Sequence, residues 1–168
     1  MDRKWYFMTG LFIMLFTSAV FAEGKYELTT ARKMLLENKA ACVLMKNNKI
    51  IMTENGRGIS PLLVIYDKNK GNLRDTVVVD QVIGRATAAI AICGKVKHVH
   101  AEVMSKDAVE FLKEYGISSS QTLLVPRILN RKRNGLCPME ATVQNIKDPQ
   151  KAVAALRAKQ IELRKQMR

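Results

Sequence analysis

Residues 76–94 read TVVVDQVIGRATAAIAICG, and this stretch decides the fold class. Residues 76–79 are β-branched and apolar on both faces, which is typical of a central strand covered by helices on each side. Residues 82–93 are rich in small side chains, so a helix there can pack closely on a sheet, and Gly94 can cap its end. The stretch therefore predicts a strand that ends at Asp80, followed directly by a helix.

The segments before this strand predict a helix, a hairpin and a second helix. Apolar residues recur at helical spacing from Leu28 to Leu36. Residues 42–45 and 50–52 are short apolar runs separated by Lys-Asn-Asn-Lys, and asparagine tolerates the positive φ of a hairpin turn. Ser60 is placed as an N-cap with Pro61 at the first helical position, which opens a short helix.

The segments after it continue the alternation. Residues 96–104 predict a strand, Ser105 can cap a helix that Gly116 closes, and residues 138–146 and 149 onward predict two further helices. Residues 117–129 are expected to be irregular because Pro126 interrupts them. The fold class predicted is a three-layer α/β/α sandwich with a mixed sheet, whose first two strands form a hairpin.

The N-terminal segment has the parts of a secretory signal. Arg3 and Lys4 precede an almost unbroken apolar run at residues 8–21, and Val20 and Ala22 occupy the positions that a signal peptidase reads. The run is shorter than the about 20 apolar residues that span a bilayer as a helix. We predict a cleaved signal peptide at residues 1–22 and an exported protein, periplasmic or secreted. An uncleaved anchor formed by residues 8–21 and a buried core helix are the alternatives.

The chain is strongly basic, with a net charge of +13. Such an excess favours polyanionic partners, and the basic side chains concentrate at residues 127–133 and 157–168. Few aromatic residues lie between them to stack on bases, so solvated faces are the simpler interpretation. Nucleic acid and anionic membrane remain alternative partners, and the sequence indicates no oligomeric state. The three cysteines cannot all pair with one another, so no disulfide scaffold is predicted.

The His100-Ala101-Glu102 triplet invites comparison with a zinc deaminase site. Those enzymes add a Pro-Cys-x-x-Cys motif, whereas here Cys137-Pro138 has the reverse order and no second cysteine follows. His98, His100 and Glu102 alternate along a predicted strand, which places them on one side of it. We therefore expect a polar strand face, with no metal and no cofactor.

A binding site for an anionic small molecule is predicted where strands end and helices begin. Gly56-Arg57-Gly58 brings flexible backbone and a cation to a helix N-terminus, which suits phosphate or carboxylate. Asp80, Gly84 and Arg85 lie at the next strand end, where open α/β sheets bind ligands. The alternative is that these residues only form tight turns and caps.

Cys137 and Glu140 are expected to border the same site. Cys137 precedes the helix that begins at Pro138, and a helix N-terminus makes a thiol more reactive. An enzyme that uses this thiol is therefore a second hypothesis, beside simple packing. A third is an interaction protein whose basic C-terminal helix docks on anionic membrane or nucleic acid.

Several of these segments together resemble a bacterial family known only as a domain of unknown function, whose fold is similar to that of cytidine deaminases. The resemblance spans roughly residues 28–156. It rests on Gly56-Arg57-Gly58-Ile59-x-Pro61-Leu62-Leu63, Val78-Val79-Asp80-x-Val82-Ile83-Gly84-Arg85-Ala86, Val103-Met104-Ser105 with Tyr115-Gly116-Ile117, Leu124-Val125-Pro126 through Asn130-Arg131, and Gly135-x-Cys137-Pro138-Met139-Glu140.

The resemblance implies a deaminase-like domain at residues 27–157, followed by a basic C-terminal helix end at residues 158–168. In that fold the helices after Gly58 and Asp80 would occupy the places of the two metal-binding motifs of deaminases. Neither place carries a set of zinc ligands in this chain. The implied protein is a deaminase-shaped scaffold with different or absent chemistry. The export segment departs from the cytoplasmic location that we expect of the family.

Overall fold

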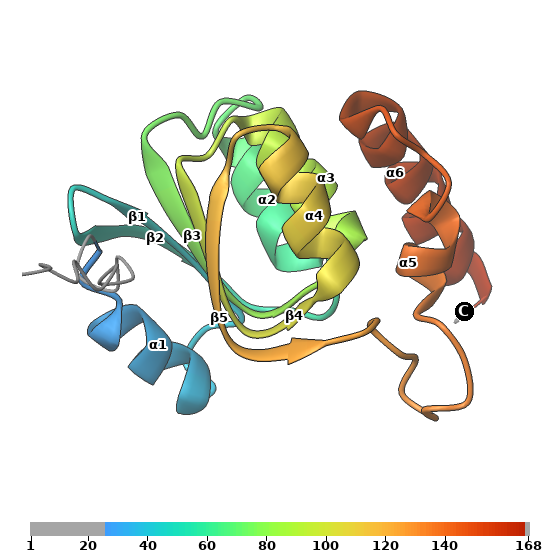
Figure 1. Cartoon of the computed structure of the whole chain (residues 1–168), viewed down its shortest axis with the longest axis horizontal. Coiled ribbons are helices and arrows are strands. Elements are labelled where there is room, and N and C mark those ends of the chain that lie inside the picture. Colours follow the sequence, from blue (N-terminus) through green and yellow to red (C-terminus); the bar gives the residue numbers. More distant parts are fainter. Residues whose placement is uncertain (1–25, 167–168) are drawn as a thin grey trace, which may run out of the picture.

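The computed structural model describes residues 26–166, in which helices and strands alternate (Figure 1). In chain order they are α1 (Thr29–Leu36), β1 (Cys42–Lys46), β2 (Lys49–Glu54), α2 (Ser60–Lys68), β3 (Thr76–Ile83), α3 (Arg85–Gly94), β4 (His98–Ser105), α4 (Lys106–Glu114), β5 (Ser118–Val125), α5 (Pro138–Val143) and α6 (Pro149–Gln166). The predicted signal peptide and the last two residues lie outside the described residues. Within residues 26–166, no helix is long and apolar enough to cross a membrane.

The strands form one mixed five-stranded sheet in the order β2-β1-β3-β4-β5. The predicted hairpin pairs β1 with β2, and Asn47 and Asn48 at its turn have φ values of 50° and 58°. β1 is also antiparallel to β3, whereas β3, β4 and β5 are parallel to one another. The mixed sheet and the α/β class predicted from the sequence are confirmed.

Helices lie on both faces of the sheet, with α2, α3 and α4 on one face and α1 on the other (Figure 1). Successive residues of β3 serve the two faces, because side chains alternate along a strand. Val78 belongs to the larger core under α2–α4, and Val77 and Val79 pack with Leu35 of α1 in a smaller one. α5 and α6 pack outside α3.

α3 lies at the centre of the molecule, which explains its small side chains. Every residue from Arg85 to Ile92 is buried, because the helix is enclosed by the sheet and by α2, α4, α5 and α6. A Cβ at Gly94 would lie 2.9 Å from Leu73 Cδ1, so the helix end approaches the neighbouring loop too closely for a larger residue. The predicted close packing of this helix is confirmed.

Four local predictions are corrected. β3 continues three residues beyond Asp80, so α3 begins at Arg85. Lys95, with φ 58°, takes the left-handed position predicted for Gly94. Ser60 is the first residue of α2 and not its N-cap, and its Oγ accepts a hydrogen bond of 2.6 Å from Gln160 Nε2. Residues 118–125, expected to be irregular, form β5, since pairing with β4 overrides the weak strand preference of three serines.

The predicted cap of α4 is confirmed, because Ser105 Oγ accepts a hydrogen bond of 3.2 Å from Ala108 N. The predicted basic C-terminal helix also forms, as α6. Part of its charge is neutralised: Arg157 pairs with Asp67, and Lys159 lies 2.8 Å from Glu162. This helix therefore presents less free positive charge than its sequence alone indicates.

Candidate ligand pocket at the carboxyl ends of two strands

Strand direction brings the two predicted parts of the site together. β2 and β3 are both antiparallel to β1, so they run in the same direction and their carboxyl ends lie at one edge of the sheet. Each is followed by a helix, which begins at Ser60 after β2 and at Arg85 after β3. The loop at residues 56–58 therefore lies beside the strand end at residues 80–84.

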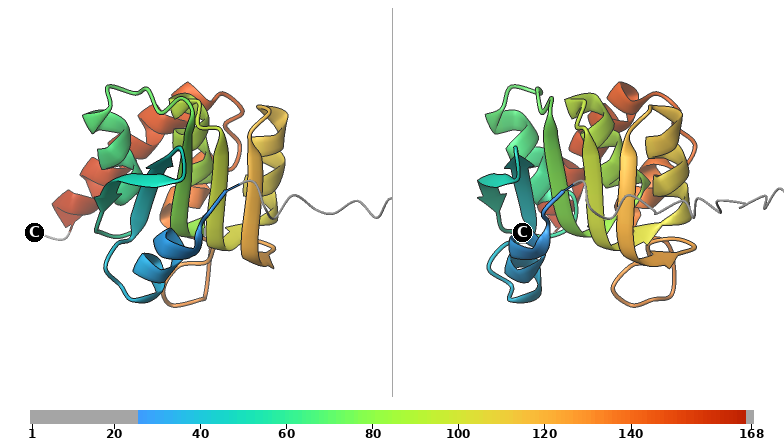
Figure 2. Two further views of the ribbon diagram at one scale, coloured as in Figure 1. Left: turned by 90° about the vertical axis from the view of Figure 1, so that its left-hand side faces the viewer. Right: turned by 60° about the vertical axis from the view of Figure 1, so that its left-hand side comes forward.

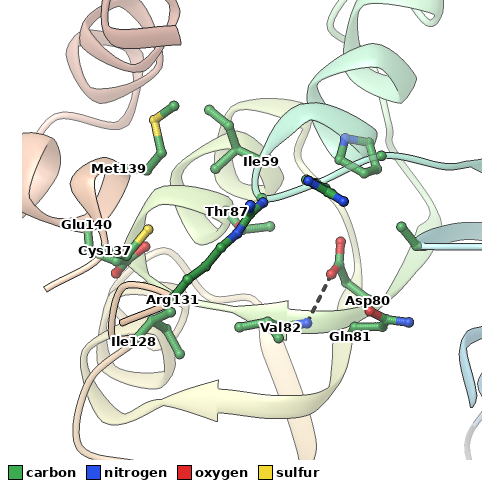
Figure 3. A pocket seen from close by; sticks show the side chains of 16 residues that line it. Ile59, Asp80, Gln81, Val82, Thr87, Ile128, Arg131, Cys137, Met139 and Glu140 are labelled. Carbon is green, nitrogen blue, oxygen red and sulfur yellow. Dashed lines mark hydrogen bonds between the residues drawn. The ribbon is translucent and has the colours of Figure 1, made fainter. Parts of the chain in front are cut away.

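A pocket of about 540 Å³ opens at this edge (Figure 3). Its lining comes from the loop before α2, the end of β3, the start of α3, and the segment that leads into α5. The lining residues are Ala41, Gly56, Arg57, Gly58, Ile59, Pro61, Asp80, Gln81, Val82, Gly84, Thr87, Ile128, Arg131, Cys137, Met139 and Glu140. Six of the seven predicted site residues line this one pocket, and Arg85 does not.

Two guanidinium groups border the pocket. Arg57 comes from the loop before α2, and Arg131 extends across the pocket from the loop after β5 (Figure 3). Both residues are exposed, and neither side chain has a hydrogen bond or an ion pair with another described residue. Two cations without carboxylate partners among the described residues add positive potential to the pocket.

Asp80 is a buried carboxyl on the pocket wall. The residue is 6% exposed, and its Oδ1 accepts a hydrogen bond of 3.1 Å from Val82 N. Burial raises the pKa of Asp80 to about 7, although the hydrogen bonds from Val82 and Cys42 act in the opposite direction. Protonated and ionised forms of Asp80 therefore coexist near neutral pH, which is unusual for a carboxyl and typical of functional sites.

Glu140 caps α3 from a different helix. Its Oε2 accepts a hydrogen bond of 2.8 Å from Arg85 N, and its Oε1 accepts one of 3.0 Å from Ala86 N. Burial raises the pKa of Glu140, and the two backbone bonds oppose that effect. The N-terminus of α3 thus already holds an anionic group of the protein itself, so a ligand would have to bind through other groups.

Gly84 makes this cap sterically feasible, which leads to a prediction. A Cβ at Gly84 would overlap the carboxyl group of Glu140. We expect Gly84→Ala to lower the free energy of unfolding by about 1–3 kcal/mol, as overpacking of a tight site does. Urea denaturation measures this effect. Gly135→Ala is the matched control, because its Cβ would lie 3.4 Å from Asn130 Nδ2, and a loss of similar size there would contradict the steric explanation.

Arg85 is directed away from the pocket, into the protein. Its Nη1 lies 2.9 Å from Asp107 Oδ1, while Nε and Nη2 donate to the carbonyl oxygens of Val143 and Ile146 at 3.2 and 2.9 Å. The guanidinium carbon also lies 3.8 Å from the centre of the Phe111 ring. Arg85 is therefore a cross-link between α3, α4 and the end of α5, and it does not reach a ligand in the pocket.

Cys137 lines the pocket as the N-cap residue of α5. The loop before it folds back on itself, since Cys137 N donates to Ile128 O at 3.0 Å and Leu129 pairs with Leu136. This turn brings Arg131 to the pocket, and sequence reasoning missed that residue. The basic cluster at residues 127–133 was visible in the sequence, but nothing indicated which of its members faces inward.

The sequence matches the family described as a domain of unknown function, DUF1893, over residues 30–160. The chain belongs to the DUF1893 family. A crystal structure of a DUF1893 family protein from Thermotoga maritima is similar to this one, with a TM-score of 0.71 and 27% sequence identity. The similarity covers 79% of this chain and 88% of that one. No curated protein matches this chain.

The two histidines of this DUF1893 domain lie on the opposite face of the sheet from Asp80. Val77 pairs with His98 and Val79 with His100, so both imidazoles are on the face of the sheet on which α1 lies. Among residues 26–166, no three or more histidine, cysteine, aspartate and glutamate side chains are grouped so as to hold a metal ion. His98, His100 and Glu102 alternate along β4 and so lie together on this face, as predicted.

Proposed function

We propose that this DUF1893 chain binds a nucleotide-like or other anionic small molecule in the pocket at the ends of β2 and β3. The observation that carries the proposal is that Arg57 and Arg131, two cations from distant loops with no partner among the described residues, line the same pocket. Arginine is suited to phosphate because its planar guanidinium donates two parallel hydrogen bonds. The start of α2 at Ser60 adds the positive end of a helix dipole beside them.

Asp80 supports a ligand that also carries a polar ring or amide. An ionised carboxyl accepts hydrogen bonds, and a protonated one also donates one, so a group with a pKa near 7 can match either edge of a heterocycle. Ile59, Ile128 and Met139 supply apolar contact surface beside it. Cationic groups at one side and a titratable carboxyl at the wall fit a phosphate joined to a base.

The finer fold assignment belongs to the same proposal. The strand order β2-β1-β3-β4-β5 and the helices that follow β2 and β3 support a cytidine-deaminase-like domain, as the sequence resemblance implies. The bacterial origin is supported by that resemblance alone. The proposal includes no reaction, because a shared fold does not carry an activity with it. The alternative is an enzyme that uses Cys137 as a reactive thiol. A bound ligand that protects this thiol from alkylation would be compatible both with binding alone and with the enzyme.

The proposal predicts measurable binding of adenosine monophosphate. Isothermal titration calorimetry on the full chain should detect this probe, while adenosine without the phosphate binds at least tenfold more weakly. Replacing Arg57 or Arg131 with glutamine should weaken binding about tenfold each, which corresponds to about 1.4 kcal/mol per arginine. Inorganic phosphate alone should compete with the nucleotide, since it occupies the same guanidinium groups.

Arg133→Gln is the matched control, because it removes the same charge from the same loop without touching the pocket. Its affinity should stay within twofold of the unmodified chain. Equal losses in Arg131→Gln and Arg133→Gln would show a diffuse effect of the positive charge and would contradict the pocket. Absence of saturable binding of both adenosine monophosphate and phosphate at millimolar concentration would remove the proposal.

Export is also part of the proposal. The composition of residues 1–22 supports a cleaved signal peptide, and the mature chain would then begin at Glu23. The ligand would accordingly be one that is present outside the cytoplasm. Mass spectrometry of the protein purified from the organism that makes it would identify the first residue, and an intact N-terminus would favour the anchor.

A further inference from the structure

A second pocket, of about 590 Å³, lies on the other face of the sheet, where α1 leaves β4 and β5 uncovered by described helices (Figure 2, right). One wall consists of residues at and before α1, among them Tyr26, Glu27 and Arg32. The other wall consists of side chains of β4 and β5, among them His100 and Thr122. Neither the family nor the proposed function assigns a role to this pocket.

The strand wall is a ladder of polar side chains. Parallel pairing places His98 beside Ser118 and His100 beside Ser120. His98 Nδ1 lies 2.8 Å from Ser118 Oγ and its Nε2 lies 2.9 Å from Ser120 Oγ, which in turn lies 2.8 Å from His100 Nδ1. The four side chains therefore form one continuous hydrogen-bonded chain across two strands.

The donors and acceptors in this row of hydrogen-bonded side chains can be assigned from Ser118 onward. Ser118 Oγ donates its only hydrogen to the carbonyl oxygen of Lys97 at 3.2 Å, so it must accept from His98 Nδ1. With a neutral ring, His98 Nε2 then accepts from Ser120 Oγ, and the oxygen of Ser120 accepts from His100 Nδ1. This order leaves His100, in its neutral form, with an unprotonated Nε2.

His100 Nε2 and Glu102 form a pair of hydrogen-bond acceptors. Burial lowers the pKa of His100, which keeps the ring neutral at pH 7. Its Nε2 is buried, has no hydrogen-bond partner among the described residues, and lies 3.8 Å from Glu102 Oε1. Glu102 is held in place by Arg32 at 2.7 and 3.0 Å and by Thr122 at 2.8 Å.

Two hydrogen-bond acceptors that lie 3.8 Å apart can share one donor that lies between them. A nitrogen can lie about 2.9 Å from both atoms and donate a separate N–H to each. The local charge favours a cationic donor, since Arg32 is the only arginine or lysine among the lining residues and is already paired with Glu102. Glu27, which also lines the pocket, has no ion pair with another described residue. The Tyr26 ring stacks on His98 at 4.8 Å and provides an aromatic surface for a cation.

We propose that this pocket binds a small molecule through a primary ammonium group, which donates hydrogen bonds to His100 Nε2 and Glu102 Oε1. The Tyr26 hydroxyl is also buried and has no hydrogen-bond partner within residues 26–166, so it is available to a second polar group of the ligand. The site is independent of the nucleotide-like ligand proposed above, because it lies on the opposite face of the sheet.

The test is a titration of the full chain with ethylammonium, followed by long-range ¹H–¹⁵N NMR of the imidazole rings. Before any addition, His100 should show the tautomer protonated at Nδ1. Ethylammonium should shift the Nε2 resonance of His100 saturably at millimolar concentration. Tetramethylammonium, which has the same charge but no N–H, should produce no saturable shift.

Variants then separate the ammonium site from general charge effects. Glu102→Gln should weaken the binding of ethylammonium at least tenfold, whereas Glu110→Gln on the exposed side of α4 should leave its binding unchanged. A His100 tautomer protonated at Nε2, equal shifts with the two cations, or unchanged binding in Glu102→Gln would each overturn the proposal. The first two readouts use the unmodified chain, so they hold even if Glu102→Gln disturbs α1.

Discussion

Replacing Arg85 with methionine is expected to lower the free energy of unfolding of this DUF1893 domain by about 3–5 kcal/mol, because it removes two hydrogen bonds from a charged group, each worth about 1.5–3 kcal/mol. The guanidinium is 10% exposed and donates to the carbonyl oxygens of Val143 and Ile146 as well as to Asp107. Methionine fills a similar volume, but it leaves the carbonyl oxygen of Ile146 without this donor and leaves that of Val143 with only the hydrogen bond from Ile146 N. Urea denaturation followed by circular dichroism measures the difference.

Two further variants show which contacts matter. Asp107 is half exposed, so water can replace its partner, and Asp107→Asn should cost no more than about 1 kcal/mol. Arg85→Lys keeps the charge but cannot donate to three partners in one plane. The stability of this variant should therefore fall between the stabilities of Arg85→Met and Asp107→Asn. A loss in Asp107→Asn as large as that in Arg85→Met would show that the ion pair, and not the bonds to the carbonyl groups, holds the helices.

Arg85 and Glu140 stabilise each other's helices. The carboxyl group of Glu140, from α5, binds the N-terminal amides of α3, where the helix dipole is positive. The guanidinium of Arg85, from α3, binds carbonyl oxygens at and just beyond the end of α5, where the dipole is negative. This reciprocal capping gives the Gly84-Arg85 and Pro138-Met139-Glu140 segments a structural role.

The sequence predicted the strand ends of the pocket better than its side chains. Strand and helix order follows from local periodicity, and the direction of a hairpin-linked strand then places residues 56–58 beside Asp80. The position of Arg131 depends on how the loop after β5 folds back, which no local pattern encodes. Arg85 was predicted to face a ligand because open α/β sheets bind ligands where a strand ends and the next helix begins. Its burial against Phe111 depends on α4 and α5, which lie far along the chain.

The strand β5 was missed for a related reason. Ser118, Ser119 and Ser120 have little preference for strands, and Pro126 ends the segment. They form a strand because β4 offers a free edge, and because the hydroxyl groups of Ser118 and Ser120 bond to the Nδ1 atoms of His98 and His100. Both reasons depend on tertiary contacts, which the local sequence pattern does not show. The alternation of His98, His100 and Glu102 indicated a polar face, but its complement on β5 appears only once the two strands are paired.

Asp80 is expected to make the domain less stable as the pH rises toward 8. Burial raises the pKa of Asp80 from 3.8 to about 7, so between these values the folded state holds a proton that the unfolded state has lost. The stability that this proton contributes is complete below about pH 4 and is lost as the pH rises through 7. Each unit of difference in pKa corresponds to about 1.4 kcal/mol, so the total effect is on the order of a few kcal/mol.

Asp80→Asn isolates this contribution, because the amide keeps an oxygen for Val82 N and cannot ionise. Urea denaturation at pH 5 and pH 8 should show that the variant gains stability relative to the unmodified chain at the higher pH, by about 2 kcal/mol or more. Glu110→Gln, an exposed change on α4, should follow the pH dependence of the unmodified chain. If the stability of Asp80→Asn also followed the pH dependence of the unmodified chain, the pKa of Asp80 would have to be the same in the folded and unfolded states. A carboxyl whose ionisation destabilises the fold, in the wall of a pocket that Arg57 and Arg131 also line, supports the proposed function in binding, since an amide of the same shape would serve the fold better.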